Sequence, residues 1–138
     1  MKIYLLHPLA VHFPIALLLT ALFFKVGDLL FKKEGWGKTS TTLLFLGTLA
    51  AVIAAGLGLL AEETVPHVPD AWEYLYTHKR LGLVTAGLFS VLSVWRFFFT
   101  DRWPKAFFWV WILASVVLIV TAYFGGELVF QFGVGYHQ

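Results

Sequence analysis

Histidines close to the start of apolar segments are the residues of this chain whose type and spacing could support chemistry. His7 and His12 both lie in the opening stretch HPLAVHFP, residues 7–14, and His78 precedes another apolar run. A neutral imidazole is a common ligand of haem iron, zinc and copper. Ionisable side chains in membrane segments are candidates for function, because they are costly to bury there. These histidines therefore predict a bound cofactor or metal ion.

Haem b is the cofactor that we favour, with His12 and His78 as its ligands and His7 near the mouth of the site. Along a helix, His12 lies about 7.5 Å deeper than His7, which makes His12 the better partner for His78. Gly82 follows His78 by one turn, and Gly126 belongs to a glycine-rich closing segment. Both glycines would let a flat ring approach the backbone. Covalently attached haem c is excluded, because the sequence contains no cysteine.

Two alternatives to haem stay open. A zinc or copper ion could be bound by three histidines and a carboxylate. The candidate ligands for such a site are His7, His12, His67, His78 and Glu127. Alternatively, the histidines only cap helices or bond free carbonyls, and the chain is a non-catalytic membrane subunit without a cofactor. No catalytic residue stands out in any of these cases, so we expect a binding protein rather than an enzyme.

The bulk composition indicates that these residues belong to an integral membrane protein. Hydrophobic residues make up 59% of the 138 residues and charged residues only 13%, against about 25% charged in soluble domains. Four apolar segments, residues 8–31, 41–61, 78–99 and 104–124, approach the roughly 20 residues that cross a bilayer. A spanning segment must satisfy its own backbone hydrogen bonds. We therefore predict an all-α, four-transmembrane-helix bundle that forms a single domain over residues 1–138.

Prolines, glycines and charges predict details of the helices and their connections. Pro14 either kinks the first helix or marks its start. Lys25 and Asp28 lie three apart, on one helix face, and are expected to form an ion pair near the inner membrane surface. Residues 62–77 contain four acidic side chains and two prolines, so we expect a long loop there. The glycines of residues 125–135 predict backbone that turns or is approached closely.

The basic residues predict the orientation in the membrane. Most of them fall in the two short loops: Lys32, Lys33, Lys38, Arg96, Arg102 and Lys105. The positive-inside rule places these loops in the cytoplasm. Both termini, the acidic loop and the histidines, His137 included, then face outward. We expect a multi-pass protein in the lipid bilayer of a bacterial-type inner membrane, and the net charge of +2 is too small to indicate nucleic acid as a partner.

Three motifs mark the start, the middle and the end of the chain. They are HPLAVHFPIAL at residues 7–17, His78-Lys79-Arg80 at the entry to the third predicted helix, and GGELVF followed by GVG at residues 125–135. Together they resemble the bacterial membrane family known as domain of unknown function 2231, over nearly the whole chain. The family often carries tyrosine where this chain has Phe130.

The resemblance implies four transmembrane helices and an electron-transfer setting. The electron-transfer setting is implied because some relatives are joined to c-type cytochrome domains. The resemblance therefore suggests a c-type cytochrome or another redox protein as the partner. We therefore favour a small b-type haem or redox-linked electron-transfer subunit with an outward-facing histidine cluster.

Overall fold

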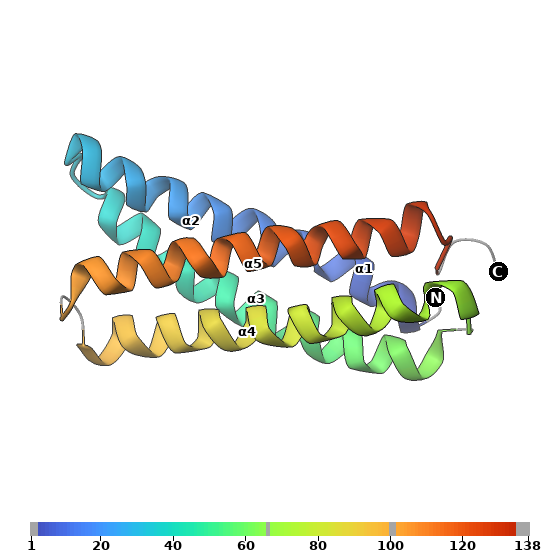
Figure 1. Cartoon of the computed structure of the whole chain (residues 1–138). Helices are drawn as coiled ribbons and strands as arrows, with labels where there is room; N and C mark the ends of the chain where they lie inside the picture. The colour runs from blue at the N-terminus through green and yellow to red at the C-terminus, as the bar shows by residue number, and fades with distance from the viewer. Residues whose placement is uncertain (1–2, 66, 100–101, 135–138) are drawn as a thin grey trace.

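The chain forms an all-helical bundle, with no strand among the residues that the structure describes (Figure 1). In this computed structural model the described residues are 3–65, 67–99 and 102–134. The elements in chain order are η1 (Ile3–Leu5), α1 (Leu6–Ala10), α2 (His12–Phe31), α3 (Trp36–Thr64), η2 (Pro69–Ala71), α4 (Trp72–Phe99) and α5 (Pro104–Phe130). Four stretches are long and apolar enough to cross a membrane: Leu6–Phe31, Trp36–Thr64, Pro69–Phe99 and Pro104–Phe130. The predicted fold class, a bundle of four transmembrane helices, is confirmed.

Two antiparallel helix pairs make up the bundle. α2 packs along α3, α4 packs along α5, and contacts between α3 and α4 join the two pairs. Left-handed backbone at Lys32, with a φ of 46°, and at Gly35, with a φ of 85°, turns the chain between α2 and α3. Trp103, with a φ of 55°, lies directly before α5. Such short connections make neighbouring helices antiparallel.

Close packing and hydroxyl hydrogen bonds join the helices in the interior. The largest fully buried hydrophobic side chains are Trp111, Phe89, Leu18, Leu44 and Leu92. In lipid there is little hydrophobic driving force between helices, so packing and interhelical hydrogen bonds carry more of the stability. The hydroxyls of Thr48 and Ser93, 2.8 Å apart, bridge α3 and α4. Those of Thr85 and Thr121, 3.0 Å apart, bridge α4 and α5.

Pro14 interrupts the first membrane span rather than starting it. Proline has no N–H to donate to the carbonyl of Ala10, four residues earlier, so the helical ladder loses one hydrogen bond at this point. α1 ends at Ala10 and α2 begins at His12. Val11 between them keeps helical angles, with φ of −63° and ψ of −22°. The helix is therefore interrupted at Val11, and helical structure begins upstream of Pro14, at Leu6.

The prediction of a long loop at residues 62–77 is wrong. α3 continues to Thr64, and α4 begins at Trp72 after the short η2 turn. Pro69 opens η2, where its missing N–H costs nothing. No proline or glycine occurs between Trp72 and His78, so the polar composition of that segment does not prevent a helix. His78 consequently lies in the second turn of α4 and not at its start.

Two other helix boundaries differ from the predicted ones. α3 begins at Trp36 rather than near residue 41, because Gly35 takes the left-handed backbone that ends the preceding turn. α5 continues to Phe130 rather than ending near residue 124. Gly125 and Gly126 are helical, so the predicted turn does not occur there. Among the described glycines of this segment, Gly133 takes left-handed backbone, with a φ of 63°.

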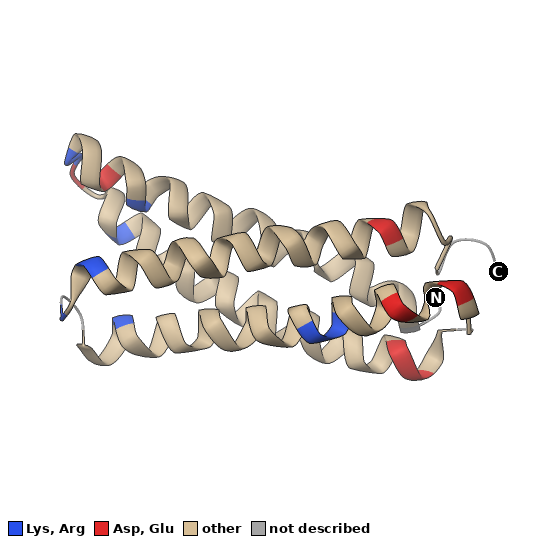
Figure 2. Cartoon of the chain, viewed as in Figure 1, with Lys and Arg blue, Asp and Glu red and all other residues tan. Residues whose placement is uncertain are grey.

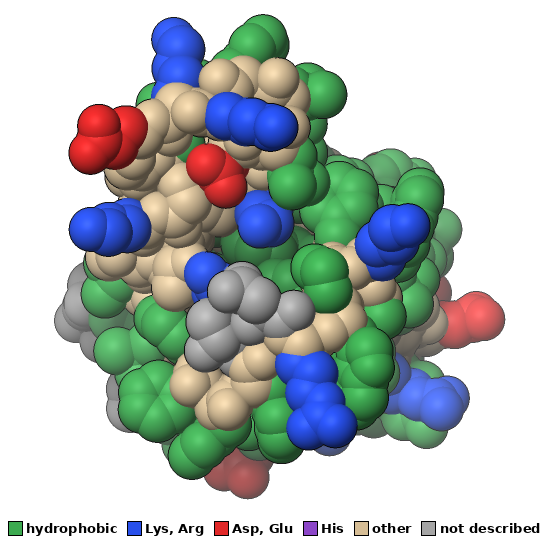
Figure 3. Space-filling view, turned by 90° about the vertical axis from the view of Figure 1, so that its left-hand side faces the viewer, with side chains coloured by type: hydrophobic (Ala, Val, Ile, Leu, Met, Phe, Trp, Pro, Cys, Tyr) green, Lys and Arg blue, Asp and Glu red, His purple; other side chains and the backbone are tan. Residues whose placement is uncertain are grey.

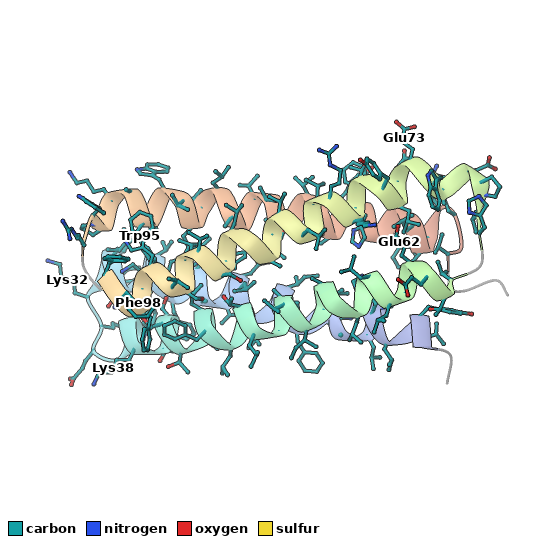
Figure 4. All side chains as sticks on the ribbon, turned by 90° about the horizontal axis from the view of Figure 1, so that it is seen from below. Lys32, Lys38, Glu62, Glu73, Trp95 and Phe98 are labelled. Carbon is teal, nitrogen blue, oxygen red and sulfur yellow. The ribbon has the colours of Figure 1, made fainter. Side chains whose placement is uncertain are left out.

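Charged side chains separate toward the two ends of the bundle. Figure 2 shows basic side chains mainly where α2 meets α3 and α4 meets α5, and mainly acidic ones at the opposite end. Figure 4 labels Lys32 and Lys38 at the first end, and Glu62 and Glu73 toward the other. Seen end-on, the first end carries several Lys and Arg side chains with hydrophobic ones between them (Figure 3). The two short connections thus share one end, while their location in the cytoplasm stays a prediction.

The predicted ion pair between Lys25 and Asp28 does not form. The ion pair found between described residues joins Lys79 of α4 to Glu62 of α3, with 2.7 Å between Nζ and Oε2. Asp28 lies instead over the first turn of α3, where a Cβ built on Gly37 would come within 3.0 Å of its Oδ2 atom. A carboxylate beside a helix N-terminus is favourable because of the helix dipole. Asp28 is therefore placed to interact with the start of α3.

Candidate cofactor site

A cavity of about 410 Å³ lies between the helices in the half of the bundle that contains the α3–α4 connection. Residues from α1, α2, α3, α4 and α5 line it, and most of them are apolar. Three of the lining residues are histidines: His7, His12 and His78. Cavities of roughly 300–1,000 Å³ with few polar groups are typical of small-molecule and cofactor sites. The size and the lining therefore suit an organic ligand.

The imidazoles of His7 and His78 lie next to each other in this cavity. Their ring centres are 5.9 Å apart and their planes meet at 66°. His7 comes from the first turn of α1, at the start of the first membrane span, whereas His78 comes from the second turn of α4. The fold thus brings together two histidines that are distant in the sequence, both at the same end of the bundle.

Each of these two imidazoles uses Nδ1 for a hydrogen bond to a backbone carbonyl of a neighbouring helix. The Nδ1 atom of His7 lies 2.9 Å from the carbonyl oxygen of Ala54 in α3. The Nδ1 atom of His78 lies 3.0 Å from the carbonyl oxygen of Thr121 in α5. Because a carbonyl oxygen can only accept, Nδ1 must carry the hydrogen, and the lone pair of the neutral ring is on Nε2. Neither Nε2 atom hydrogen-bonds to any residue that the structure describes.

A glycine lies one helical turn beyond each of these carbonyls and makes room for the ring. A Cβ built on Gly58, four residues after Ala54, would lie 3.0 Å from Cε1 of His7. A Cβ built on Gly125, four residues after Thr121, would lie 2.9 Å from Cε1 of His78. Contacts this close force a side chain to shift. Both helix pairs therefore repeat one arrangement, in which a histidine packs on the carbonyl and the glycine of the partner helix.

The histidine of the first span that lies next to His78 is His7, and not His12 as the sequence had predicted. His12 lines the cavity but is exposed, and its Nδ1 lies 3.4 Å from the carbonyl oxygen of Leu9, in its own stretch of chain. Residues five apart point about 140° away from each other around a helix. When His7 faces His78, His12 must therefore turn aside. The direction of a histidine around its helix, and not its depth alone, therefore decides which one meets His78.

The glycines chosen from the sequence are not the ones that the rings approach most closely. Gly82 and Gly126 both line the cavity. The nearest atom to a Cβ on Gly82 would be Cγ2 of Thr121 at 3.9 Å, and for Gly126 it would be an atom of Phe130 at 4.0 Å. The predicted close approach to the closing segment is found one residue earlier, at Gly125. Gly58 was missed, although it belongs to a segment rich in small residues that sequence reasoning could have examined turn by turn.

The described residues do not assemble the predicted metal site of three histidines and a carboxylate. No three His, Asp or Glu side chains among them form a group that could hold a metal ion. His67 lies in the α3–α4 connection, exposed, with its ring 5.1 Å from that of Trp72. Glu127 lies beside Tyr123 on α5. His137 is outside the described residues.

The family of this chain follows from a comparison with models of protein families. A family model described as "Predicted membrane protein (DUF2231)" matches residues 5–138. Comparisons with curated proteins and with solved structures gave no match. Since the family model covers nearly the whole chain, this protein belongs to that family of predicted membrane proteins, domain of unknown function 2231.

Proposed function

We propose that this membrane protein binds a b-type haem between His7 and His78 and serves as a small electron-transfer subunit. The observation that carries the proposal is the pair of neighbouring imidazoles whose Nδ1 atoms are both held by backbone carbonyls. Histidines that bind metals usually donate their other ring N–H to a carbonyl or carboxylate, which fixes the tautomer and the ring orientation. Both histidines already have that support from α3 and α5.

The separation of the two rings fits one shared iron ion. Imidazole–metal bonds of about 2.0–2.1 Å on both sides place the two ring centres roughly 6 Å apart, and the centres of His7 and His78 are 5.9 Å apart. Helix bundles hold cofactors between facing helices, and haem iron commonly takes histidine as an axial ligand. Bound haem would supply one-electron transfer, and the chain would supply both ligands and an apolar surrounding.

Haem suits the site better than zinc or copper does. One water-sized occupant needs only about 10–15 Å³ of such space, whereas this cavity measures about 410 Å³. A zinc ion in a protein normally has at least three protein ligands, and the described residues offer no group of three. The competing reading is that His7 and His78 only tie their helices together through the Nδ1 bonds. It leaves the two Nε2 atoms and the cavity without a role.

The visible spectrum of the purified full chain tests the proposal. We expect a Soret band and sharp bands of six-coordinate haem after reduction, in protein produced with adequate haem. His7→Ala and His78→Ala should each abolish these bands in protein that still inserts and folds. The matched controls are His12→Ala and His67→Ala, which should keep them. A colourless wild type that takes up no added haem, or a spectrum unchanged in both ligand variants, would contradict the proposal.

We further propose that the haem end of the bundle faces the outside of a bacterial-type inner membrane, where a c-type cytochrome or another redox protein is the partner. The basic residues of the two short connections support this orientation through the positive-inside rule. A reporter fused after Gln138 tests it. A reporter that works only outside the cytoplasm should be active there, and activity of a cytoplasm-only reporter would reverse the assignment.

A further inference from the structure

The wall of the cavity contains one oppositely charged pair among its described residues, Lys79 of α4 and Glu62 of α3. Their side chains are 36% and 27% exposed, so the pair stands at the mouth of the cavity and not in its interior. Lys79 directly follows His78 in the sequence. The other polar side chains of the wall include Thr85 and Thr121, whose two hydroxyl hydrogens have acceptors in each other's oxygen and in carbonyls of their own helices.

Lys79 keeps hydrogen-bonding capacity beyond its ion pair. An ammonium group has three donors, and Glu62 accepts from it at 2.7 Å. A second acceptor can therefore join without loss of the first. A carboxylate is the acceptor that a cation binds most strongly, and among the described residues of this mostly apolar wall Lys79 is the one Lys or Arg side chain.

We propose that Lys79 anchors a carboxylate at the edge of the bound molecule, so that the site selects a planar, apolar ligand with peripheral carboxylates. This inference rests on the proposed function, because haem carries two propionate groups at one edge. In that arrangement His7 and His78 would hold the iron, and Lys79 would hold a propionate at the mouth. Glu62 opposes the propionate, since two carboxylates then share one cation.

Arg80 provides a matched comparison for Lys79. It is the next residue on α4 and also carries a positive charge, but its guanidinium lies over the ring of Tyr76, 5.5 Å from the ring centre. Arg80 is exposed and does not line the cavity. A general attraction of the protein surface for anions would involve both cations, whereas an anchor at the cavity involves Lys79.

Titration of the purified, haem-free full chain with haem and with haem dimethyl ester tests the anchor. The ester has the same ring and iron but no charged propionates. We expect Lys79→Met to weaken binding of haem about fivefold, the range of a partly exposed ion pair, and to leave binding of the ester unchanged. Glu62→Gln should strengthen binding of haem about twofold. A folding defect would weaken binding, so it cannot explain this result. Lys79→Arg should bind haem as the wild type does, and Arg80→Met should alter neither titration.

Equal weakening of haem and ester by Lys79→Met would show that the residue only ties α4 to α3, and unchanged haem binding would also overturn the anchor. In both cases the ligand role of His7 and His78 would stand. Failure of the wild type to bind either molecule would overturn the proposed function and the anchor together.

Discussion

The two helix pairs place an imidazole at the same site from different local structures. In the first pair, His7 is the second residue of the short helix α1, which Val11 separates from α2. In the second pair, His78 lies inside the continuous helix α4. Histidine and acceptor are 47 residues apart in the first pair and 43 in the second. Both imidazoles are thus placed by a carbonyl and a glycine one turn apart on the partner helix. The position of the histidine within its own helix differs between the two pairs.

The pairs differ in what supports the acceptor carbonyl. Thr121 provides the acceptor for His78, and its hydroxyl also bonds the hydroxyl of Thr85 and the carbonyl of Val117. Ala54 provides the acceptor for His7 and has no polar side chain. The second imidazole therefore rests on a helix pair that hydroxyls cross-link next to the site, whereas Ala54 contributes no side-chain hydrogen bond beside the first. We expect changes near His7 to disturb the site more easily than equivalent ones near His78.

Filling the two glycine positions should have the largest effect, and it should disturb the imidazole of both pairs. Gly58→Ala and Gly125→Ala each put a methyl group about 3 Å from an imidazole carbon. Overpacking of this kind costs about 1–3 kcal/mol, so we expect haem affinity to fall by roughly tenfold or more. Gly56→Ala is the matched control, because a Cβ there meets no atom within 4 Å. Titration with haem measures all three, and wild-type affinity in both test variants would refute the shared arrangement.

Restoring the missing backbone hydrogen bond should affect only the first pair. Pro14→Ala gives residue 14 an N–H that can bond the carbonyl of Ala10, so α1 and α2 should become continuous. The redirected helix would move His7 away from the Ala54 carbonyl. We expect haem affinity to fall about fivefold, equivalent to about 1 kcal/mol. Pro8→Ala, in the first turn of α1, serves as the control and should bind normally. Normal binding by the Pro14 variant would show that the break does not direct His7.

Removal of the cross-link in the second pair should lower stability by a small amount. Thr85→Val and Thr121→Val each delete one hydroxyl of the 3.0 Å contact. Interhelical hydrogen bonds in membrane proteins average about 0.6 kcal/mol in double-mutant cycles, and we expect a coupling of that size. Denaturation of the two single variants and the double variant in detergent measures it. Additive effects of the two substitutions would indicate that the hydroxyls act independently, and the proposed difference between the pairs would then disappear.

The fold could be predicted from the sequence because it depends on composition over long segments. Four apolar stretches of membrane length can hardly form anything but helices, and short loops then make neighbours antiparallel. The ends of the helices could not be predicted as well. Apart from Leu75, residues 72–77 are polar or aromatic. Such a composition suits a loop and a helix end at a membrane surface equally, and in the folded protein the segment is helical.

The candidate site could be predicted only in part, for a geometric reason. His7 and His78 were both among the chosen residues, since histidines near the ends of membrane segments stand out. Which residue of the first span faces α4 depends on the rotation of a helix that Pro14 interrupts. The acceptor carbonyls of Ala54 and Thr121 leave no signal in residue type at all. Gly58 and Gly125 do leave one, but glycines are frequent in both segments.

A charged residue at the far end of the bundle should have the smallest effect. Asp28 lies over the first turn of α3, at the end of the bundle opposite His7. A surface carboxylate at a helix N-terminus contributes about 0.3–1 kcal/mol, so Asp28→Asn should lower the free energy of unfolding by a few tenths of a kcal/mol. Haem affinity should not change, in contrast to Glu62→Gln at the cavity mouth. Thermal denaturation and haem titration of the two variants make this comparison. Loss of haem from a folded Asp28→Asn protein would mean that the two ends of the bundle are coupled, because Asp28 does not line the cavity.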